Sequence, residues 1–416
     1  MKPFSKITVL DISQGIAGPM CGAILARQGA KVIKVEPLGG DWMRGTGASR
    51  EQMSANVISG NINKRSLAID ASKSEGRQAL LRLAKQADVL VENFRTGVMA
   101  RLGLDYPSLR AVNPGLIYCS VSGFGARGPY ATKAATDSVL QAFTGMLLAN
   151  GIKTSVEGVS GVIPKRIGLY VPDNISAIYA AQAVSAALFE RTETKFGQHI
   201  EISLAEASSA FQAGPMIDSF LFPDASERGA VLAPAGDFQT ADGWIIVASL
   251  TDEMFLRLAR AVDREVWLSD PRFSENGARK RHFNEINAAL GQVLKERGNA
   301  EWLERLEAAD ILVSPVNDYL AFRDAPQTRA MDYFGEVEQT PYGRLTVPHL
   351  PASDRELRPA PRLGEHSREI LTEFGFSVAE IEALLQQGVV EQSASRPAAT
   401  TEEKPIEAEL KYQERK

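Results

Sequence analysis

The chain is poor in the residues that build disulfide frameworks and metal centres. Its 416 residues include two cysteines, Cys21 and Cys119, and four histidines that do not share the spacing of metal ligands. Both cysteines lie in apolar surroundings and far apart in the sequence, so we expect them to be buried small hydrophobic side chains. These counts argue against a disulfide scaffold and against a zinc site. We therefore expect no bound metal.

Long apolar runs and a strong charge excess are also missing. The chain has no uninterrupted apolar stretch of about 18 residues, the length that suggests a membrane span. Its formal net charge is −5, which gives no general attraction to nucleic acid or to anionic membranes. The first residues lead directly into a predicted strand and do not resemble a signal peptide. With 44% apolar residues, the composition is that of a globular protein, which we expect in the cytoplasm.

Common nucleotide and nucleophile motifs are absent or lack their context. Residues 123–128 read Gly-Phe-Gly-Ala-Arg-Gly, but Pro129 follows and no helix is predicted to open there. A dinucleotide-binding fingerprint needs that helix, so NAD binding is not indicated. The chain contains neither a P-loop nor the Gly-x-Ser-x-Gly elbow of serine hydrolases.

The first part of the chain alternates strands and helices. Residues 7–36 form a strand, a small-residue turn at 15–18, a helix and a second strand, which is a βαβ unit. A helix at 73–86 and apolar strands at 89–92 and 116–121 continue the alternation. Because buried parallel strands are continuous apolar runs, this pattern predicts an α/β fold with a doubly wound parallel sheet.

The predicted domains are a large α/β domain at 1–221, completed by 331–388, and a linker with a smaller α/β domain at 222–330. In the large domain we expect a helix at 135–148 followed by a loop, and helices at 174–191 and 204–220. In the small domain we expect a hairpin at 238–250 and helices at 252–263, 280–297 and 300–308. Residues 389–416 are charged and almost without large apolar residues, so we expect a disordered tail.

Residues 167–203 place one acid, Asp173, at the start of a long apolar helix. Pro172 and Asp173 are typical of a helix start, and a strand is predicted at 199–203. Two interpretations are open for Asp173. It can be an N-cap that accepts hydrogen bonds from free backbone N–H groups, which is the more common role, or it can be a catalytic carboxylate.

Several motifs in a fixed order resemble the family III CoA-transferases, the group that includes formyl-CoA transferase and the α-methylacyl-CoA racemases. After the βαβ unit come Asn-Lys-Arg-Ser at 63–66, Ala-Asp-Val-Leu-Val-Glu-Asn-Phe at 87–94, Arg-Leu-Gly-Leu at 101–104 and the segment 113–124. Segments at 241–244, 315–317 and 361–365 also fit. The similarity runs from about residue 4 to about residue 385. It implies a transferase of acyl-CoA metabolism and a homodimer of two interlocked rings.

The resemblance also implies the site residues. Asp173 matches the nucleophile that forms covalent acyl and CoA intermediates. Thr136 and Asp137 match the substrate pocket, and Thr136 stands where the racemases have a histidine base. The coenzyme A thioester, which is a substrate and not a resident cofactor, is expected to contact Gly15, Ile16, Ala17, Ile69, Asn93, Phe94, Arg95 and Arg101.

Two alternatives and the substrate remain open. The chain can be a 2-methylacyl-CoA racemase or epimerase, although Thr136 cannot serve as a base near neutral pH. It can also be an acyl-CoA-binding subunit of a heteromeric transferase. We expect a dicarboxylic donor such as succinyl-CoA, with Arg44, Arg95 or Lys133 as the cation for the second carboxylate and an apolar wall from Ile16 and Phe238.

Overall fold

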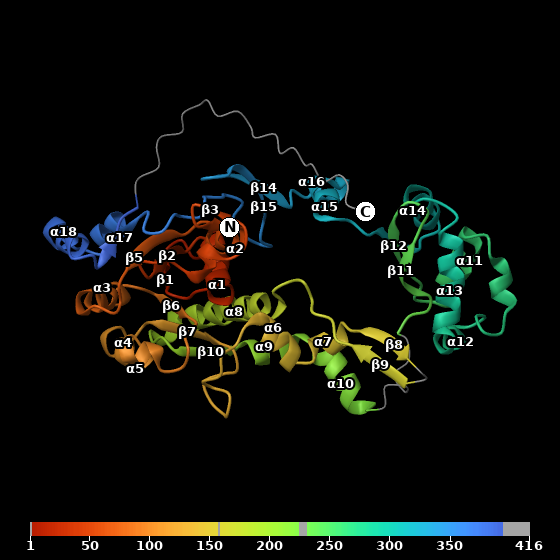
Figure 1. Ribbon diagram of the computed structural model, residues 1–416, viewed down its shortest axis with the longest axis horizontal. Helices are drawn as coiled ribbons and strands as arrows, with labels where there is room; N and C mark the ends of the chain where they lie inside the picture. The colour runs from red at the N-terminus through yellow and green to blue at the C-terminus, as the bar shows by residue number, and fades with distance from the viewer. Residues whose placement is uncertain (1, 157–158, 224–230, 394–416) are drawn as a thin grey trace. The chain divides into compact units, whose positions relative to one another are not determined.

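The computed structural model describes residues 2–156, 159–223 and 231–393 (Figure 1). They form two compact units. The first contains the residues up to 212 and the segment from 333 onward, and the second contains residues 213–332. Helix α10 (Ala213–Leu221) therefore belongs to the second unit, whereas the sequence placed it in the large domain.

A seven-stranded sheet organises the first unit. The strands lie in the order β10-β7-β6-β1-β2-β5-β16, in which the first six are parallel and β16 runs antiparallel to β5. The chain winds outward from β1 in one direction and from β6 in the other, which confirms the predicted doubly wound sheet. The strands are β1 (Thr8–Asp11), β2 (Lys31–Glu36), β5 (Arg65–Ile69), β6 (Val89–Glu92), β7 (Ile117–Ser122), β10 (His199–Ser203) and β16 (Val390–Glu391).

Helices cover both faces of this sheet. Successive side chains of a strand point to opposite faces, so Val9 and Val89 pack against α1 and α8, while Leu10 and Leu90 pack in the cluster that contains α3, α17 and α18. Burial on both faces explains the continuous apolar runs in the sequence. The covering helices are α1 (Ala17–Arg27), α3 (Ser74–Ala84), α8 (Val171–Thr194), α17 (Ser367–Glu373) and α18 (Val378–Gln386).

The shorter elements of the first unit follow the prediction in part. Strands β6 and β10 have the predicted bounds, and β2 ends at residue 36 as predicted. The predicted helix at 135–148 is divided in two, because Gly145 takes a left-handed conformation with φ +84°. A hairpin follows it where a loop was expected. The further elements are η1 (Trp42–Gly45), β3 (Ser49–Arg50), β4 (Met53–Ser54), α2 (Ala55–Asn61), α4 (Val98–Leu102), α5 (Tyr106–Val112), α6 (Asp137–Phe143), α7 (Met146–Ala149), β8 (Ile152–Val156), β9 (Val159–Ile163) and α9 (Leu204–Phe211).

The second unit has a three-stranded antiparallel sheet with helices around a separate core. Phe255 and Trp302 lie in this core. The predicted hairpin is present, and Thr240 N donates to Gly243 O at 2.9 Å across its turn. The predicted helix at 280–297 is interrupted at His282. The elements are β11 (Ala235–Gln239), β12 (Trp244–Ala248), α11 (Asp252–Ala261), η2 (Glu265–Ser269), α12 (Asn276–Arg281), α13 (Phe283–Leu294), α14 (Asn299–Ala308), β13 (Leu312–Pro315), α15 (Tyr319–Asp324) and α16 (Pro326–Ala330).

The returning segment is more ordered than the loop and extended chain that the sequence indicated. Strands β14 (Phe334–Gln339) and β15 (Gly343–Pro348) form a hairpin. Tyr342 Oη donates to Met53 O at 2.7 Å and so joins this hairpin to β4 within the first unit. The tail prediction for 389–416 is wrong at its start, because Val390 is 3% exposed and pairs with Ile69. From residue 394 that prediction concerns residues outside the described ranges.

Both cysteines are free and buried, as the sequence predicts. They lie in the core between the sheet and α1 and α8. The contact with the Cys119 thiol, together with burial, raises the pKa of the Cys21 thiol. A neutral thiol is a poor nucleophile, so Cys21 acts as a packing group. Over the described ranges, each helix falls short of the length or apolar character needed to cross a membrane.

Candidate active site

A cavity of about 400 Å³ opens at the carboxyl ends of β1, β6 and β7. The winding of the sheet reverses between β1 and β6, and open α/β sheets bind ligands at this point. The volume is that of a small-molecule pocket. The lining residues are Gln14, Gly15, Ile16, Ala17, Trp42, Met43, Thr46, Asn93, Phe94, Arg95, Thr96, Val121, Ser122, Gly123, Phe124, Ala131, Lys133, Ala135, Thr136, Asp137, Ser138, Tyr170, Asp173 and Leu204.

Asp173 lies in the first turn of α8 and lines this cavity. The N-cap position belongs to Tyr170, so the interpretation of Asp173 as an N-cap is wrong. Burial and, to a smaller extent, the nearby Asp137 carboxyl together raise the pKa of Asp173 to about 7. A half-buried aspartate that titrates near neutrality is typical of a functional site.

Asp137 supports the start of α8 and not its own helix. It is the first residue of α6, and its Oδ2 accepts a hydrogen bond from Asp173 N at 3.3 Å. Gln141, which is fully buried, donates from Nε2 to Asp137 Oδ1 at 2.7 Å. Gln141 also bonds the backbone of Ile167 and Leu169, which lead into α8. One buried amide thus fixes both the second carboxyl and the approach to Asp173.

Most of the predicted site residues come together in this cavity. Asp173, Thr136 and Asp137 line it with Gly15, Ile16, Ala17, Asn93, Phe94 and Arg95. Two predicted contacts lie elsewhere. The Ile69 side chain is 2% exposed and packs in the core beside α3, so it is already covered. Arg101 is exposed on α4, away from the lining.

The side chain of Asn93 is already used within the protein. Gln14 N donates to Asn93 Oδ1 at 2.8 Å, and Asn93 Nδ2 donates to Gln14 O at 2.6 Å. This reciprocal pair joins the loop after β6 to the loop after β1 across the switch point. Asn93 therefore shapes the pocket, and Gln14, which the sequence analysis did not select, lines it.

Two side chains expected at the substrate are engaged elsewhere. Arg44 is 2% exposed and donates to both oxygens of Glu36, at 2.7 and 2.8 Å. It is therefore not available to a second substrate carboxylate. Phe238 is 5% exposed in the core of the second unit, so it cannot supply an apolar pocket wall. A single sequence does not show which side chains enclose these two residues in the folded protein.

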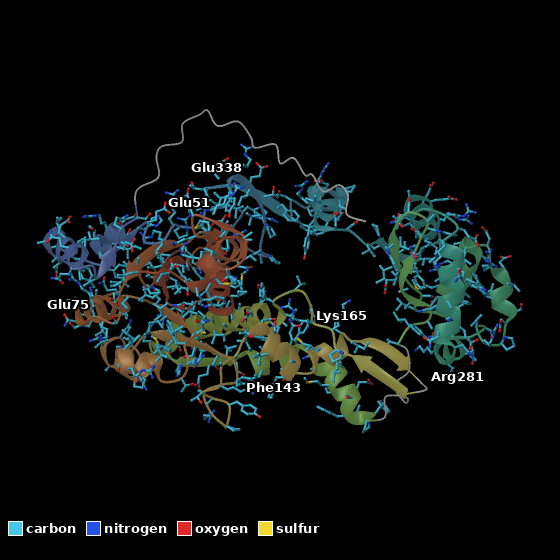
Figure 2. The ribbon with its side chains drawn as sticks, in the orientation of Figure 1. Glu51, Glu75, Phe143, Lys165, Arg281 and Glu338 are labelled. Atoms are coloured by element: carbon cyan, nitrogen blue, oxygen red, sulfur yellow. The ribbon has the colours of Figure 1, made fainter. Side chains whose placement is uncertain are left out.

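Lys133 remains as an exposed cation of the pocket. Its Nζ lies 4.6 Å from the ring centroid of Tyr130 and 5.6 Å from that of Phe124. The two rings pack edge to face with Phe143, which Figure 2 labels. The aromatic faces hold the ammonium group by cation–π attraction and leave its N–H groups free to meet an anion.

A family model described as CoA-transferase family III matches residues 4–367. The chain belongs to this family. Among curated relatives, the succinate–glutarate CoA-transferase of Agrobacterium fabrum is 33% identical over 393 residues, which cover 89% of this chain and 96% of that protein. The succinyl-CoA–D-citramalate CoA-transferase of Chloroflexus aurantiacus is 32% identical over 394 residues, covering 90% and 94%.

Solved structures of the family have the same fold. A CAIB/BAIF family protein from Brucella suis superposes with a TM-score of 0.78 at 31% identity, covering 90% of this chain and 99% of that one. The chain is therefore a family III CoA-transferase, an enzyme whose substrates are CoA thioesters. Among the described residues, no group of three or more His, Cys, Asp or Glu side chains could hold a metal ion.

Proposed function

We propose that this enzyme moves CoA from an acyl-CoA donor to a carboxylic acid through covalent intermediates on Asp173. The observation that carries the proposal is the half-buried Asp173 carboxyl in the switch-point cavity, beside a second carboxyl. A carboxylate suits this role because it forms an anhydride and then a thioester, so the energy of the substrate thioester is conserved.

The steps balance in atoms and charge. A carboxylate oxygen of Asp173 attacks the thioester carbon, the carbon–sulfur bond breaks, and CoA leaves as a thiolate. The thiolate attacks the Asp173 carbonyl carbon of the mixed anhydride, which releases the donor acid as a carboxylate and leaves an aspartyl-CoA thioester. The acceptor carboxylate then enters, and the same steps run in reverse. The N-terminus of α8 stabilises the negative charge that develops at Asp173.

Chemical trapping of the covalent intermediate on Asp173 tests this proposal. After incubation with succinyl-CoA, treatment with hydroxylamine should convert Asp173 to a hydroxamate, and peptide mass spectrometry should locate it. Untreated protein should carry a CoA adduct on the same peptide. Modification of another residue, or of none under turnover conditions, would contradict the aspartyl mechanism.

The pH dependence should identify the role of Asp137. Only ionised Asp173 attacks, so kcat/KM should rise with pH through about 7, the pKa of Asp173. Asp137→Asn removes the negative charge that helps to raise this pKa, so the midpoint should move to lower pH. The profile is measured with succinyl-CoA between about pH 5 and 9. Glu190→Gln, at the far end of α8, is the control. An unmoved or higher midpoint in Asp137→Asn would contradict the coupling.

We propose a dicarboxylic acyl-CoA donor. The relatives from Agrobacterium fabrum and Chloroflexus aurantiacus are named for succinate–glutarate and succinyl-CoA–citramalate transfer. A second carboxylate needs a cation in the pocket. Of the three cations expected from the sequence, Arg95 and Lys133 line the cavity, and Arg44 is paired with Glu36.

Replacement of Lys133 should separate dicarboxylic from monocarboxylic acids. In Lys133→Met, KM for succinate should rise about tenfold, because a charge-assisted hydrogen bond is lost. KM for butanoate should stay within about twofold, since it lacks the second carboxylate. The control is Lys165→Met, which changes an exposed lysine of the same unit (Figure 2). Equal changes for both acids would place Lys133 on another part of the substrate.

We also propose an interlocked homodimer. The outer face of α8 carries Ile178 and Phe189, which are 59% and 75% exposed. The two residues are about three helical turns apart and therefore lie on the same side of the helix. Exposed apolar side chains on one side of a helix suit contact with another protein surface, and a second copy of the chain is the proposed partner. Light scattering of the purified chain should give twice the mass of 45.1 kDa. A stable monomer, or activity only with a different subunit, would contradict a homodimer.

Free buried thiols suit the reducing cytoplasm, the compartment that we propose.

The position of Thr136 supports transfer over racemisation. Thr136 lines the cavity next to Asp137, and its hydroxyl does not titrate near neutral pH. A racemase needs a base at the α-carbon. Uptake of deuterium at that carbon of a 2-methylacyl-CoA, without an acceptor acid, would favour the racemase instead.

A further inference from the structure

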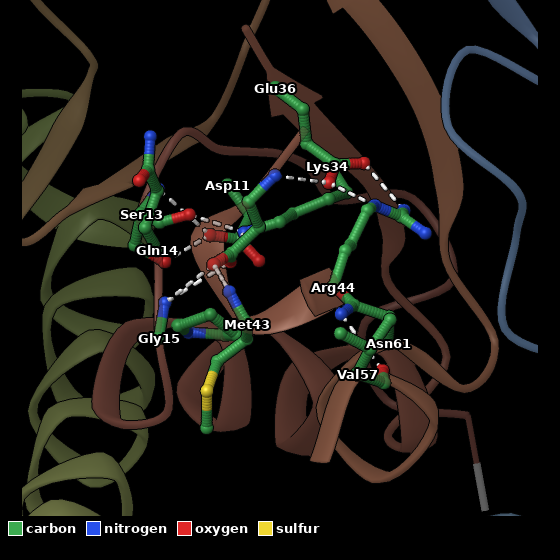
Figure 3. Close-up of polar contacts among 12 residues, drawn as sticks. Asp11, Ser13, Gln14, Gly15, Lys34, Glu36, Met43, Arg44, Val57 and Asn61 are labelled. Carbon is green, nitrogen blue, oxygen red and sulfur yellow. Dashed lines mark hydrogen bonds and ion pairs between the residues drawn. The ribbon is translucent and has the colours of Figure 1, made fainter. Parts of the chain in front are cut away.

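Side chains hold the loop after β1 at three consecutive residues. Ser13 N donates to Asp11 Oδ1 at 3.1 Å, and Lys34 Nζ donates to Ser13 O. Gln14 is paired through both backbone groups with Asn93, as described above. Gly15 N donates to both carboxylate oxygens of Asp41, each at 3.1 Å. Figure 3 labels Asp11, Lys34 and the loop residues Ser13, Gln14 and Gly15 among these polar contacts. A loop fixed in this way forms a rigid part of the pocket lining.

Asp41 connects two parts of that lining. Besides the Gly15 amide, its Oδ1 accepts a hydrogen bond from Met43 N at 3.0 Å, and Lys34 Nζ lies 3.2 Å from its Oδ2. Asp41 is 3% exposed. The carboxylate therefore sets the position of Gly15 on one side and of η1, which begins at Trp42, on the other.

Trp42 is the exposed residue beside Gly15 and Asp41. It lines the cavity and is 59% exposed. Its ring lies against Gly15, where a Cβ atom would come within 3.0 Å of Trp42 Cζ2. Gly15 also has φ +80°, a conformation that favours glycine. An exposed aromatic ring held this closely offers a flat apolar surface to a bound ligand.

The charges below this surface are balanced. Three acids and three bases are buried together: Asp11 with Lys64 at 2.6 Å, Lys34 with Asp41, and Glu36 with Arg44 at 2.7 Å. Burial of ion pairs often adds little net stability, because the desolvation of both charges opposes their attraction. The positions of these six side chains are well defined, however, because each charged group is buried and paired with a group of opposite charge. Such a network can serve to fix positions.

We propose that Asp41, with its charge balanced by Lys34, is a positioning residue for acyl-CoA binding. It sets Gly15 and Trp42 as one wall of the cavity, against which the CoA part of the substrate lies. This inference rests on the proposed function only in placing the CoA thioester in the same cavity. It concerns binding, and not the covalent chemistry of Asp173.

Trp42 provides a direct measurement. The chain has four tryptophans, and the other three, at positions 244, 267 and 302, belong to the second unit. Titration with coenzyme A alone should change the tryptophan fluorescence of the parent protein. The change should be lost in Trp42→Phe. Retention of the full signal in Trp42→Phe would overturn the placement of CoA against this ring.

Two double variants isolate the role of the carboxylate. Asp41→Asn/Lys34→Met and Asp41→Ala/Lys34→Met both leave the buried network neutral, so neither leaves an unpaired charge to unfold the protein. They differ in one respect, because asparagine keeps an oxygen that accepts the Gly15 and Met43 amides. The Kd of coenzyme A should stay within threefold of the parent in the asparagine variant and rise tenfold or more in the alanine variant. The kcat of the alanine variant at saturating substrate should fall less than threefold.

A matched control lies at the opposite end of the sheet. Asp88 accepts Thr8 N at 2.8 Å and pairs with Arg191 at 2.8 Å, so it has the same combination of amide and cation partners. Asp88→Ala/Arg191→Met should leave the Kd of coenzyme A unchanged. An equal rise in this control, or equal Kd values for the two Asp41 variants, would overturn the proposal. Asp173→Asn should keep the fluorescence response, so failure of the aspartyl mechanism would be distinguishable from failure of this inference.

Discussion

Replacement of Asp173 by asparagine should lower the rate of CoA transfer by at least about 10⁴-fold and at the same time stabilise the protein at pH 8. The loss follows because an amide cannot form the anhydride and thioester intermediates, and removal of a nucleophile costs several orders of magnitude. The rate is measured by mass spectrometry of succinyl-CoA exchange. Activity within about tenfold of the parent would contradict the role of Asp173.

The stabilisation follows from the pKa of Asp173, which is about 7 in the folded protein and 3.8 for an ordinary aspartate. Between these values the folded state binds more protons than the unfolded state, so stability falls as pH rises. Asparagine has no charge to desolvate. Because Asp173 is half-buried and partly solvated, we expect a gain of about 1–2 kcal/mol at pH 8 and almost none at pH 4.

Thermal unfolding at both pH values measures this difference. Glu193→Gln, on an exposed part of the same helix, should change neither activity nor stability at either pH. A variant that loses activity and is also destabilised at pH 8 would indicate that Asp173 stabilises the helix start, and that its buried charge does not lower the stability of the protein.

Removal of Lys64 should destabilise the first unit by about 3–5 kcal/mol. Lys64 and Asp11 are fully buried, and Lys64 Nζ also donates to Pro19 O at 2.7 Å and to Asn61 Oδ1 at 3.1 Å. Burial alone would raise the pKa of Asp11, but Lys64 and Lys34 outweigh it and hold this pKa below its ordinary value. Lys64→Met leaves the Asp11 charge with less compensation, and the variant should be least destabilised near the pH at which Asp11 can accept a proton.

Urea unfolding followed by circular dichroism tests this expectation. The double variant Asp11→Asn/Lys64→Met removes both charges and should recover most of the lost stability. Asp11 has a depressed pKa in the parent, so its contribution is present above about pH 4 and is lost as the pH falls below that value. A loss below about 1 kcal/mol in Lys64→Met would mean that water reaches the site.

The parts of the fold that the sequence predicted best are those with a local signal. Strands β2, β6 and β10 were located by short apolar or alternating runs and by flanking turns, and the pocket loops follow directly after strands of this kind. The helix start at Pro172 located Asp173 in the same way. These features need only a few consecutive residues, so one sequence is sufficient for them.

The features that the sequence missed depend on distant partners. Arg44 was expected at the substrate because it lies in or next to a segment predicted to form the pocket, but Glu36 and the Pro361 carbonyl enclose it. Gln141 gave no signal, since its importance comes from bonds to residues 26 and 28 positions away. The hairpin β14–β15 was not predicted, because its burial depends on residues near the start of the chain, among them Met53.

The late position of β16 has a consequence for how the protein is made. Strand β5 is complete at residue 69, but the strand that covers its edge is residues 390–391. During synthesis on the ribosome, the second unit emerges in full while the β5 edge still has free backbone N–H and C=O groups, which are a site for association with other chains. Helices α17 and α18, which close one apolar face, also emerge late. The nascent chain should therefore depend on chaperones until its last elements are available, and slower elongation through residues 213–332 would prolong that exposure.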